Sequence, residues 1–370
     1  MNNKRIIYLC PTLLSLMNSI VTQLTVNKGV PADIIFEDTM DFSEISQRLM
    51  KYSIFEDCYH WKSMGQKQIY HSLSPQQQRQ VVHKPSKVFQ IPSLRNTYSD
   101  LCANIDSYAA KFFYYSLVEK GMSPEVHFVS EGTGTYALNF ANTARDRMDH
   151  GFYKDKAFLK RVRNVYVYKP ELFTGDKTIA NLVQIPAFSS FDSAVYEIID
   201  DIFGKAEPIK EKLIFFEGAF WGDGHLANEM DLFFKIADYI GKDNVVVKRH
   251  PRNPVDRFTP FGFHVMKQQY LPWEVMIKDI DLSQKVLVSV ASFTAFSAKE
   301  MYGRISRSIL LEDLLMGKVS FLEDNGYRDF FRQAERIFNQ DEMVSWRPKN
   351  MRELEIVLDV LGEKVGGWNK

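Results

Sequence analysis

Short apolar runs rich in β-branched and aromatic residues alternate along the chain with helix-like patterns. A first series occupies residues 5–10, 32–38, 87–92, 126–130 and 164–170, and a second occupies residues 212–218, 244–251, 262–267, 285–292 and 307–313. Strands that are apolar on both faces and are separated by helices form parallel sheets covered by helices on both sides. The two series therefore predict two doubly wound, Rossmann-like α/β domains.

The length of the chain agrees with this division. Its 370 residues, 45% of them hydrophobic, are enough for two hydrophobic cores. Residues 186–210 show no strong strand pattern, so we place the boundary there and expect domains at residues 1–190 and 191–370. From residue 325 onward the pattern predicts amphipathic helices.

Charge and cysteine content narrow the classes of function. The 46 basic residues balance the 46 acidic ones, which gives no reason to expect a nucleic acid partner. The three cysteines have no C-x-x-C spacing, which favours a reducing compartment. Polar residues interrupt the apolar N-terminal segment, so it predicts a buried strand and a helix near Pro11 rather than a signal peptide or membrane span. We therefore expect a cytoplasmic protein.

Ligands of doubly wound sheets bind beyond the carboxyl ends of the strands. One such end carries the stretch Ser130–Gly134, with the sequence SEGTG. This stretch matches neither the dinucleotide nor the P-loop fingerprint, and the Glu131 carboxylate would repel a phosphate. A carboxylate on a glycine turn is suited to accept a proton from an alcohol. The alternative is a glycine turn with an incidental acid.

A second strand end carries His250, which precedes Pro251 and is flanked by Lys248, Arg249 and Arg252. The surrounding cations favour an anion such as a phosphate. His250 would then donate a hydrogen bond to the phosphate or protonate a leaving phosphate oxygen. A polar turn with a basic surface cluster is the alternative.

A third strand end carries small hydroxyl side chains at Ser289 and within Ser292–Thr294, where a strand passes into a helix. The free N–H groups of a helix start bind phosphate, although serine and threonine also serve there as ordinary caps. Before this strand, Pro272 predicts a helix start. Glu274 would accept hydrogen bonds from a ribose diol or only favour the helix start, and Trp273 would cover a base or the core.

The sequence offers no metal site. Its histidines lack ligand spacing, and Asp279 and Asp281 precede a strand, which is typical of a solvated helix end. We therefore expect neither a metal nor another cofactor. The basic run at residues 156–163 predicts a helix face, with contact to an anionic membrane as an alternative.

Together these motifs resemble those of the bacterial sialyltransferases of glycosyltransferase family 52 and the related polysialyltransferases. Ser130–Gly134 is similar to their acid motif, Arg249–Arg252 to their HP motif, and Ser289–Thr294 to their later serine/threonine motif. Ser130 stands where the family often has a first acid, which leaves Glu131 alone in that motif. Asp223, or Glu217, in the segment after the first strand of the second series, is a rival base.

The resemblance implies a GT-B fold, in which two Rossmann-like domains face each other across a cleft. Residues 1–190 would form the acceptor-side domain, and residues 191–370 the nucleotide-sugar-binding domain. The implied reaction is an inverting, metal-independent transfer of sialic acid from CMP-sialic acid to a hydroxyl of a capsule or lipooligosaccharide glycan. Glu131 or Asp223 would be the base, and His250 would stabilise the leaving phosphate.

The resemblance also implies a set of residues that bind substrate and nucleotide: Gly132, Thr133, Gly134, Lys248, Arg249, Pro251, Arg252, Trp273, Glu274, Ser289, Ser292, Phe293 and Thr294. The expected partners are a nucleotide-sugar donor and a glycan acceptor. A lipid-linked acceptor, peripheral contact with the inner membrane face and a homodimer remain open. A teichoic-acid-type polyol-phosphate transferase and a non-catalytic subunit of a polysaccharide-synthesis complex are the alternative functions.

Overall fold

The computed structural model describes residues 4–95, 97–104, 108–137, 155–178, 180–319, 322 and 325–368. The chain forms two compact units. Unit 1 comprises Met1–Pro186 and Asp192–Phe203, and unit 2 comprises Ala187–Phe191 and Gly204–Lys370. The sequence suggested a single boundary at residue 190, whereas the chain enters unit 2 for five residues and returns to unit 1 before it finally leaves.

Unit 1 contains a seven-stranded sheet in which all neighbouring strands are parallel. Its strands are β1 Ile6–Cys10, β2 Ala32–Glu37, β3 Cys58–Trp61, β4 Asp100–Ala103, β5 Glu125–Val129, β6 Val162–Val167 and β7 Asn181–Gln184. Their spatial order is β3-β2-β1-β4-β5-β6-β7. The order reverses between β1 and β4, and such a switch point is where doubly wound sheets bind ligands.

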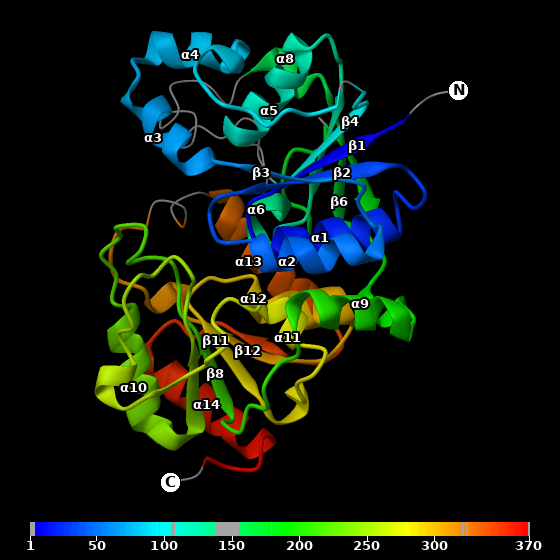
Figure 1. Ribbon diagram of the computed structural model, residues 1–370. Coiled ribbons are helices and arrows are strands. Elements are labelled where there is room, and N and C mark those ends of the chain that lie inside the picture. Colours follow the sequence, from blue (N-terminus) through cyan, green and yellow to red (C-terminus); the bar gives the residue numbers. More distant parts are fainter. Residues whose placement is uncertain are drawn as a thin grey trace. The chain divides into compact units, whose positions relative to one another are not determined.

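Helices cover both faces of this sheet, with α3, α4 and α5 on one side and α1 and α2 on the other (Figure 1). The helices are α1 Leu13–Leu24, α2 Ser43–Leu49, α3 Ser63–Ser72, α4 Pro75–His83, α5 Tyr108–Glu119, α6 Thr133–Tyr136, α8 Lys156–Leu159 and α9 Ser193–Phe203. The predicted helix near Pro11 is α1, and Thr12 and Ser15 cap it with reciprocal hydrogen bonds. This cap fixes the chain direction directly after β1.

Unit 2 contains a six-stranded parallel sheet in the order β10-β9-β8-β11-β12-β13. Its strands are β8 Leu213–Phe216, β9 Val245–Lys248, β10 His264–Val265, β11 Val286–Ser289, β12 Arg307–Leu310 and β13 Ser345–Trp346. Its helices are α10 Glu229–Ile240, α11 Trp273–Met276, α12 Thr294–Tyr302, α13 Asn325–Phe338 and α14 Met351–Lys364. This is the strand order of a dinucleotide-binding domain, with its switch point between β8 and β11.

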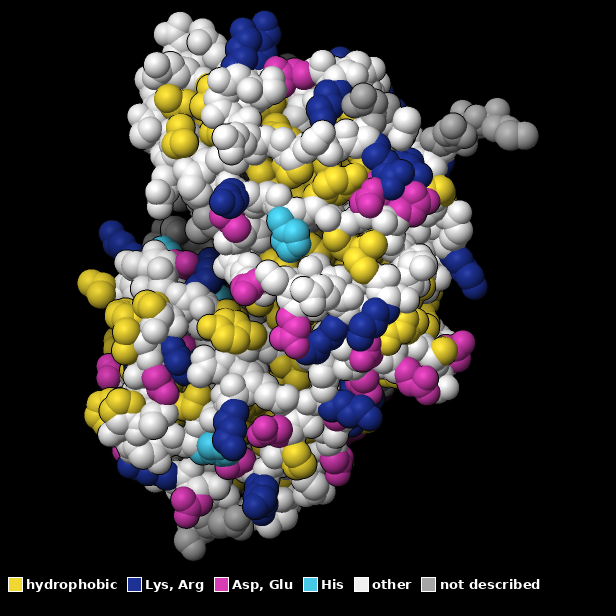
Figure 2. Space-filling model, viewed as in Figure 1, with side chains coloured by type: hydrophobic (Ala, Val, Ile, Leu, Met, Phe, Trp, Pro, Cys, Tyr) yellow, Lys and Arg dark blue, Asp and Glu magenta, His cyan; other side chains and the backbone are white. Residues whose placement is uncertain are grey.

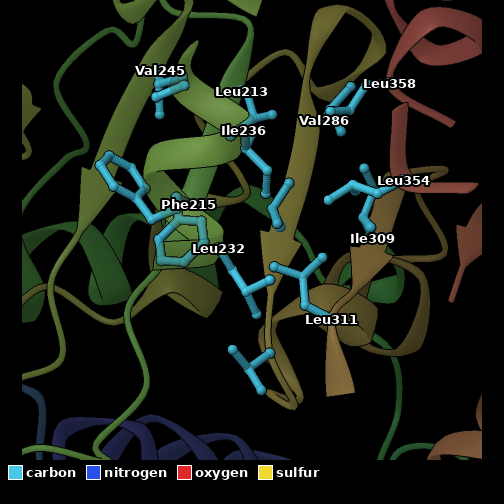
Figure 3. Close-up of a cluster of buried hydrophobic side chains, with 14 of the residues drawn as sticks. Leu213, Phe215, Leu232, Ile236, Val245, Val286, Ile309, Leu311, Leu354 and Leu358 are labelled. Atoms are coloured by element: carbon cyan, nitrogen blue, oxygen red, sulfur yellow. The ribbon is translucent and has the colours of Figure 1, made fainter. Parts of the chain in front are cut away.

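The core of unit 2 shows why these runs become central strands. Alternate side chains of β8, β11 and β12, among them Phe215, Val286 and Ile309, point to the face covered by α10 and α14 (Figure 3). Leu354 and Leu358 of α14 pack against these strand residues and complete the cluster. Strands buried on both faces need apolar residues at every position, which is the pattern that the sequence shows.

The two doubly wound sheets confirm the predicted fold class. Nine of the predicted strands are present as β1, β2, β5, β6, β8, β9, β10, β11 and β12. The strand predicted at residues 87–92 is wrong. In that segment Phe89 packs on Phe112 of α5 with 4.6 Å between ring centroids, while Val88 is 41% exposed. Two adjacent apolar residues in a loop thus produced a strand-like sequence pattern. The strand that pairs with β1 on the side opposite β2 is β4.

The C-terminal helices predicted from residue 325 are α13 and α14. The helix expected over residues 156–163 is shorter, because α8 ends at Leu159 and β6 begins at Val162. No helix in the described ranges is long and apolar enough to cross a membrane. On the face shown in Figure 2, basic and acidic side chains are interspersed, in keeping with the balanced composition.

We expect Leu358→Ala to lower the free energy of unfolding by about 2–5 kcal/mol, because the side chain is 1% exposed and its removal leaves a cavity. Ile356→Ala is the matched control, since Ile356 lies on the same helix but is 54% exposed. That change should alter stability by less than about 0.5 kcal/mol. Urea unfolding followed by circular dichroism measures both. Equal effects would show that α14 does not cover the core.

Candidate active site

In unit 1, Glu131 follows β5 and lies at the start of α6. Gly132 has a φ of 81°, which lets the chain turn sharply after Glu131. The Glu131 N–H donates to Thr135 Oγ1 at 2.9 Å, and its carboxylate oxygen Oε1 accepts from Thr12 Oγ1 at 3.2 Å. The loop after β1 thus orients the carboxylate. This confirms the expected turn and leaves Glu131 partly exposed.

Several polar groups lie near Glu131 at the switch point of unit 1. Cys10 ends β1, and its Sγ lies 3.6 Å from Ser15 Oγ of α1. Burial raises the pKa of the Cys10 thiol, and the charges of Glu131 and Glu37 raise it further. Glu37 ends β2, so both carboxylates lie close to the end of β1. Glu37 belongs to none of the motifs predicted from the sequence, although an acid at the end of an apolar strand is a usable signal.

In unit 2, Glu217 follows β8 and is the central anchor of the site. Its side chain is completely buried. Oε1 accepts from Arg257 Nη2 at 2.7 Å, and Oε2 accepts from the His250 backbone N–H at 3.0 Å. A buried carboxylate with these donors holds two loops together and is poorly placed to take a proton from a substrate. Of the two rival bases in this segment, Glu217 therefore has a positioning role.

A second buried acid, Glu229, shares Arg257 with Glu217. Its Oε1 accepts from the Gly218 N–H at 2.6 Å, and its Oε2 lies 3.5 Å from Arg257 Nη2. Burial raises the pKa of Glu229 to about 8, and the neighbouring charge of Glu217 adds to the effect. The start of α10 is thereby tied to the loop after β8.

Asn253 joins the loop after β8 to the loop after β9. Its Nδ2 donates to the Gly218 carbonyl at 2.9 Å, and its Oδ1 accepts from the Gly222 N–H at 2.8 Å. The approach is so close that a Cβ on Gly222 would lie 2.4 Å from the Arg252 carbonyl oxygen. Only glycine fits there. The two loops therefore form one structural unit.

His250 is held from two sides in this unit. Its backbone donates to Glu217, and its ring Nδ1 accepts from the Arg252 N–H at 3.2 Å. Burial lowers the pKa of His250 to about 4, and the charges of Arg252 and Lys248 act in the same direction. The ring is therefore neutral at pH 7 with its proton on Nε2. A neutral imidazole in this tautomer offers one N–H donor to a ligand.

The cations beside His250 have protein partners. Lys248 Nζ donates to the backbone carbonyls of residues 268, 269 and 271, and burial lowers its pKa to about 8. Arg249 Nη2 donates to the Asn253 carbonyl at 2.8 Å. Exposed Arg252 pairs with Asp223 Oδ1 at 2.9 Å. These side chains shape the loop and contribute positive potential, and Pro251 is exposed beside them.

The serine/threonine motif lies at the carboxyl end of β11, across the switch point from Glu217. Ser292 Oγ accepts from Thr294 Oγ1 at 2.8 Å, and the Ser292 N–H donates to buried Ser289 at 3.3 Å. Helix α12 begins at Thr294, as predicted. Phe293 is buried against Phe330 of α13. The motif thus combines two partly exposed hydroxyls with a helix N-terminus that suits an anion.

Trp273 and Glu274 form the first turn of α11, as predicted, and both are buried. Trp273 is 1% exposed and packs on Phe216, so of its two expected roles the structure places it in the core. Burial raises the pKa of Glu274, while the nearby charge of Lys248 opposes the shift. Glu274 and Lys248 thus influence each other electrostatically inside unit 2.

One group of possible metal ligands occurs among the described residues, at Asp100, Glu125 and His127. It lies at the amino ends of β4 and β5, away from the ends that carry the motifs. His127 Nε2 is 2.8 Å from Asp100 and its Nδ1 is 3.1 Å from Asn164 Nδ2, while Glu125 pairs with Arg163. Both ring nitrogens of His127 have a hydrogen-bond partner, and the group links β4, β5 and β6 through these hydrogen bonds and the Glu125–Arg163 ion pair.

The structure thus brings together His250, Asp223, Ser289 and Ser292–Thr294 in unit 2, and places Glu131–Gly134 at the corresponding edge of the unit 1 sheet. Sequence reasoning missed the groups that support them, above all Thr12, Arg257 and Asn253. Arg257 and Asn253 lie within seven residues of His250, but nothing in the sequence showed which acids they would meet.

The family model of the alpha-2,8-polysialyltransferases (POLYST) matches residues 63–310, a span that holds all three motifs. The chain belongs to the alpha-2,8-polysialyltransferase family. It is therefore a glycosyltransferase of the sialyltransferase type, and the resemblance found in the sequence is confirmed. No curated protein matches the chain significantly.

Solved structures share the fold of this polysialyltransferase family member. One is the alpha/beta-galactoside alpha-2,3-sialyltransferase of the luminous marine bacterium Photobacterium phosphoreum, with a TM-score of 0.50 at 12% identity over 93% of this chain and 99% of that chain. Another is the glycotransferase of kitacinnamycin, with a TM-score of 0.50 at 11% identity over 98% and 93% of the two chains. Together with the two parallel sheets, these similarities confirm the GT-B fold.

The depressed pKa of His250 predicts a pH-dependent stability. Between about pH 6.5 and pH 4 the unfolded chain takes up a proton at this residue and the folded protein does not, so stability falls as the pH drops through this window. We expect a contribution of up to about 1.4 kcal/mol per pH unit. His250→Gln should reduce the slope, as measured by urea unfolding at pH 7, 6, 5 and 4.

His60→Gln is the control for this experiment, because His60 is exposed to solvent. It should retain the wild-type slope. An unchanged slope in His250→Gln would show that the ring is protonated in the folded protein, contrary to the tautomer derived above.

Proposed function

We propose that this polysialyltransferase family member is an inverting glycosyltransferase that moves sialic acid from CMP-sialic acid to a hydroxyl of a surface glycan, in a capsule or lipooligosaccharide. The observation that carries the proposal is the fixed, neutral His250 at the end of β9, inside the span matched by the family model. Its Nε2–H has no partner among the described residues, and a phosphate oxygen is a fitting acceptor.

In the proposed reaction the acceptor hydroxyl loses its proton to the Glu131 carboxylate. The hydroxyl oxygen forms a bond to the anomeric carbon of the donor, and the bond from that carbon to the phosphate oxygen breaks. The electron pair leaves with CMP, whose phosphate receives a hydrogen bond from His250 Nε2–H. The hydroxyls of Ser292 and Thr294 and the N-terminus of α12 support the same charge. One displacement of this kind inverts the configuration at the carbon.

Two features favour Glu131 over Asp223 as the base. Thr12 orients the Glu131 carboxylate at the switch point of unit 1. Asp223 instead pairs with Arg252 in the loop that carries His250. A carboxylate beside the leaving phosphate would be repelled by it, whereas an ion pair with Arg252 suits that place.

We also propose that transfer needs no metal, because His250, the hydroxyls and the helix N-terminus supply donors where the phosphate charge develops. The acceptor in this proposal is a glycan, lipid-linked at the inner membrane face, and the enzyme acts in the cytoplasm. Retained activity in excess EDTA is the expected result, and complete loss that Mg²⁺ or Mn²⁺ restores would contradict the metal-free mechanism.

The donor is tested by nucleotide release from CMP-sialic acid, with UDP-sugars, GDP-sugars and CDP-polyols as competitors, each with a panel of glycan acceptors. We expect release of CMP that depends on an acceptor. Release from CDP-polyols alone would instead identify a polyol-phosphate transferase. No release with any acceptor would refute the sialyltransferase function for this chain.

The base is tested by two isosteric substitutions. Glu131→Gln should lower kcat by roughly 10²–10⁴-fold with little change in the KM of the donor, since general base catalysis contributes this much. Asp223→Asn is the matched control and should retain kcat within about tenfold, because an exposed ion pair with Arg252 is weak. The reverse ranking of the two variants would assign the base to Asp223.

A further inference from the structure

A buried asparagine whose side-chain amide has no hydrogen-bond partner among the described residues lies at the switch point of unit 1. Asn104 follows β4 and is 3% exposed. Neither its side-chain Oδ1 nor its Nδ2 has a hydrogen-bond partner in the part of the chain that the structure describes. Leaving a buried amide unsatisfied is costly, and native proteins avoid it unless the group has a use. No motif in the sequence pointed to this residue.

The sheet register places Asn104 beside the proposed base. Tyr8 of β1 pairs with Cys102 of β4, and Asn104 comes two residues after Cys102, directly beyond the carboxyl end of β4. Thr135 Oγ1 accepts from the Glu131 N–H at 2.9 Å and donates to the Asn104 carbonyl at 3.2 Å. One hydroxyl therefore joins the backbones of Asn104 and Glu131.

Asn104 follows the strand end that lies next to helix α1. It directly follows Ala103, the last residue of β4. Tyr8, the neighbour of Cys102, bonds Gln23 of α1 at 3.1 Å, so α1 covers the face of the sheet that carries Tyr8 and Cys102. Thr12, which orients the Glu131 carboxylate, caps the same helix. The Asn104 amide and the Glu131 carboxylate thus belong to the same end of the sheet.

The charges around this end indicate what kind of group fits there. Glu131 and Glu37 both lie close enough to Cys10 to act on its thiol electrostatically. Two carboxylates disfavour a phosphate or a carboxylate as the bound group. A side-chain amide both donates and accepts, and a neutral hydroxyl does the same. The chemistry therefore suits a sugar hydroxyl.

We propose that Asn104 binds a hydroxyl group of the acceptor glycan next to the one that Glu131 deprotonates, and so determines acceptor specificity. The inference rests on the proposed glycosyl transfer. Rotation of the amide about χ2, which is a broad torsion in asparagine, lets it turn toward a ligand without breaking any hydrogen bond that the structure shows. A site that is built to pair with a hydroxyl discriminates strongly against an acceptor that lacks it.

The test combines stability with kinetics in Asn104→Leu, a change of similar size. Because the amide makes no hydrogen bond to any residue that the structure describes, the variant should unfold at an equal or higher temperature than the wild type. Its KM for the glycan acceptor should rise about tenfold. Its KM for CMP-sialic acid should stay within about twofold of the wild type, since the motifs proposed to bind the donor lie in unit 2.

Asn27→Leu is the matched control at a second buried asparagine of unit 1. Asn27 is 5% exposed, but its Nδ2 donates to Tyr8 Oη at 2.8 Å. This variant should lose thermal stability and keep the acceptor KM of the wild type. Asn104→Ser retains a group that donates and accepts hydrogen bonds, so it should restore part of the acceptor affinity. It also keeps the test possible if the Asn104→Leu variant does not fold.

Acceptor analogues that each lack one hydroxyl identify the group. Removal of the hydroxyl bound by Asn104 should lower kcat/KM of the wild type about tenfold and leave Asn104→Leu unaffected. Lowered stability of Asn104→Leu with an unchanged acceptor KM would overturn the inference and assign the amide to a buried water molecule. A failure of the proposed function gives a different result from a failure of this inference, because the wild-type protein would then release no CMP with any acceptor.

Discussion

A single buried carboxylate, Glu217, determines how the donor-side loops are arranged. A charge taken out of water must be compensated, and here Arg257 and the His250 backbone provide the compensation. These contacts fix the loop after β8 against the loop after β9, which lie on neighbouring strands. The position of the His250 ring follows from this contact rather than from the HP dipeptide itself. Electrostatic preorganisation in the proposed reaction thus begins with a residue that never touches substrate.

The sequence predicted the parts of the site that are local, and it missed the parts that depend on contacts across the sheets. Residues at strand ends, such as Glu131 and His250, were predictable because parallel strands end at one edge. The partners of His250 were not, since Glu217 lies 33 residues away and becomes a neighbour only through strand pairing. Trp273 shows the same limit, because a tryptophan at a helix start suits a nucleobase as well as a core.

The same physical reason explains the errors in the fold predicted from the sequence. Central strands such as β8 and β11 are buried on both faces and read as continuous apolar runs. Strand β4 has only four residues and begins with Asp100, whose carboxylate forms a hydrogen bond with His127 of the adjacent strand. A carboxylate inside a buried strand contradicts the apolar pattern unless its partner is known. For this reason the sequence favoured the loop around Phe89 over the true strand.

The neutral state of His250 has a consequence for the end of the catalytic cycle. An imidazolium would attract the dianionic nucleotide product strongly and slow its departure, whereas a neutral ring holds it by one hydrogen bond. Lys248 and Arg249 are the cations that precede His250 in the sequence. Both donate hydrogen bonds to backbone carbonyls, so neither has to break an ion pair with the product when it leaves. In the proposed reaction, the loop would therefore combine a positive potential that attracts the donor with few ion pairs to break when the spent nucleotide leaves. Such an arrangement would favour rapid exchange of the spent nucleotide for the next donor.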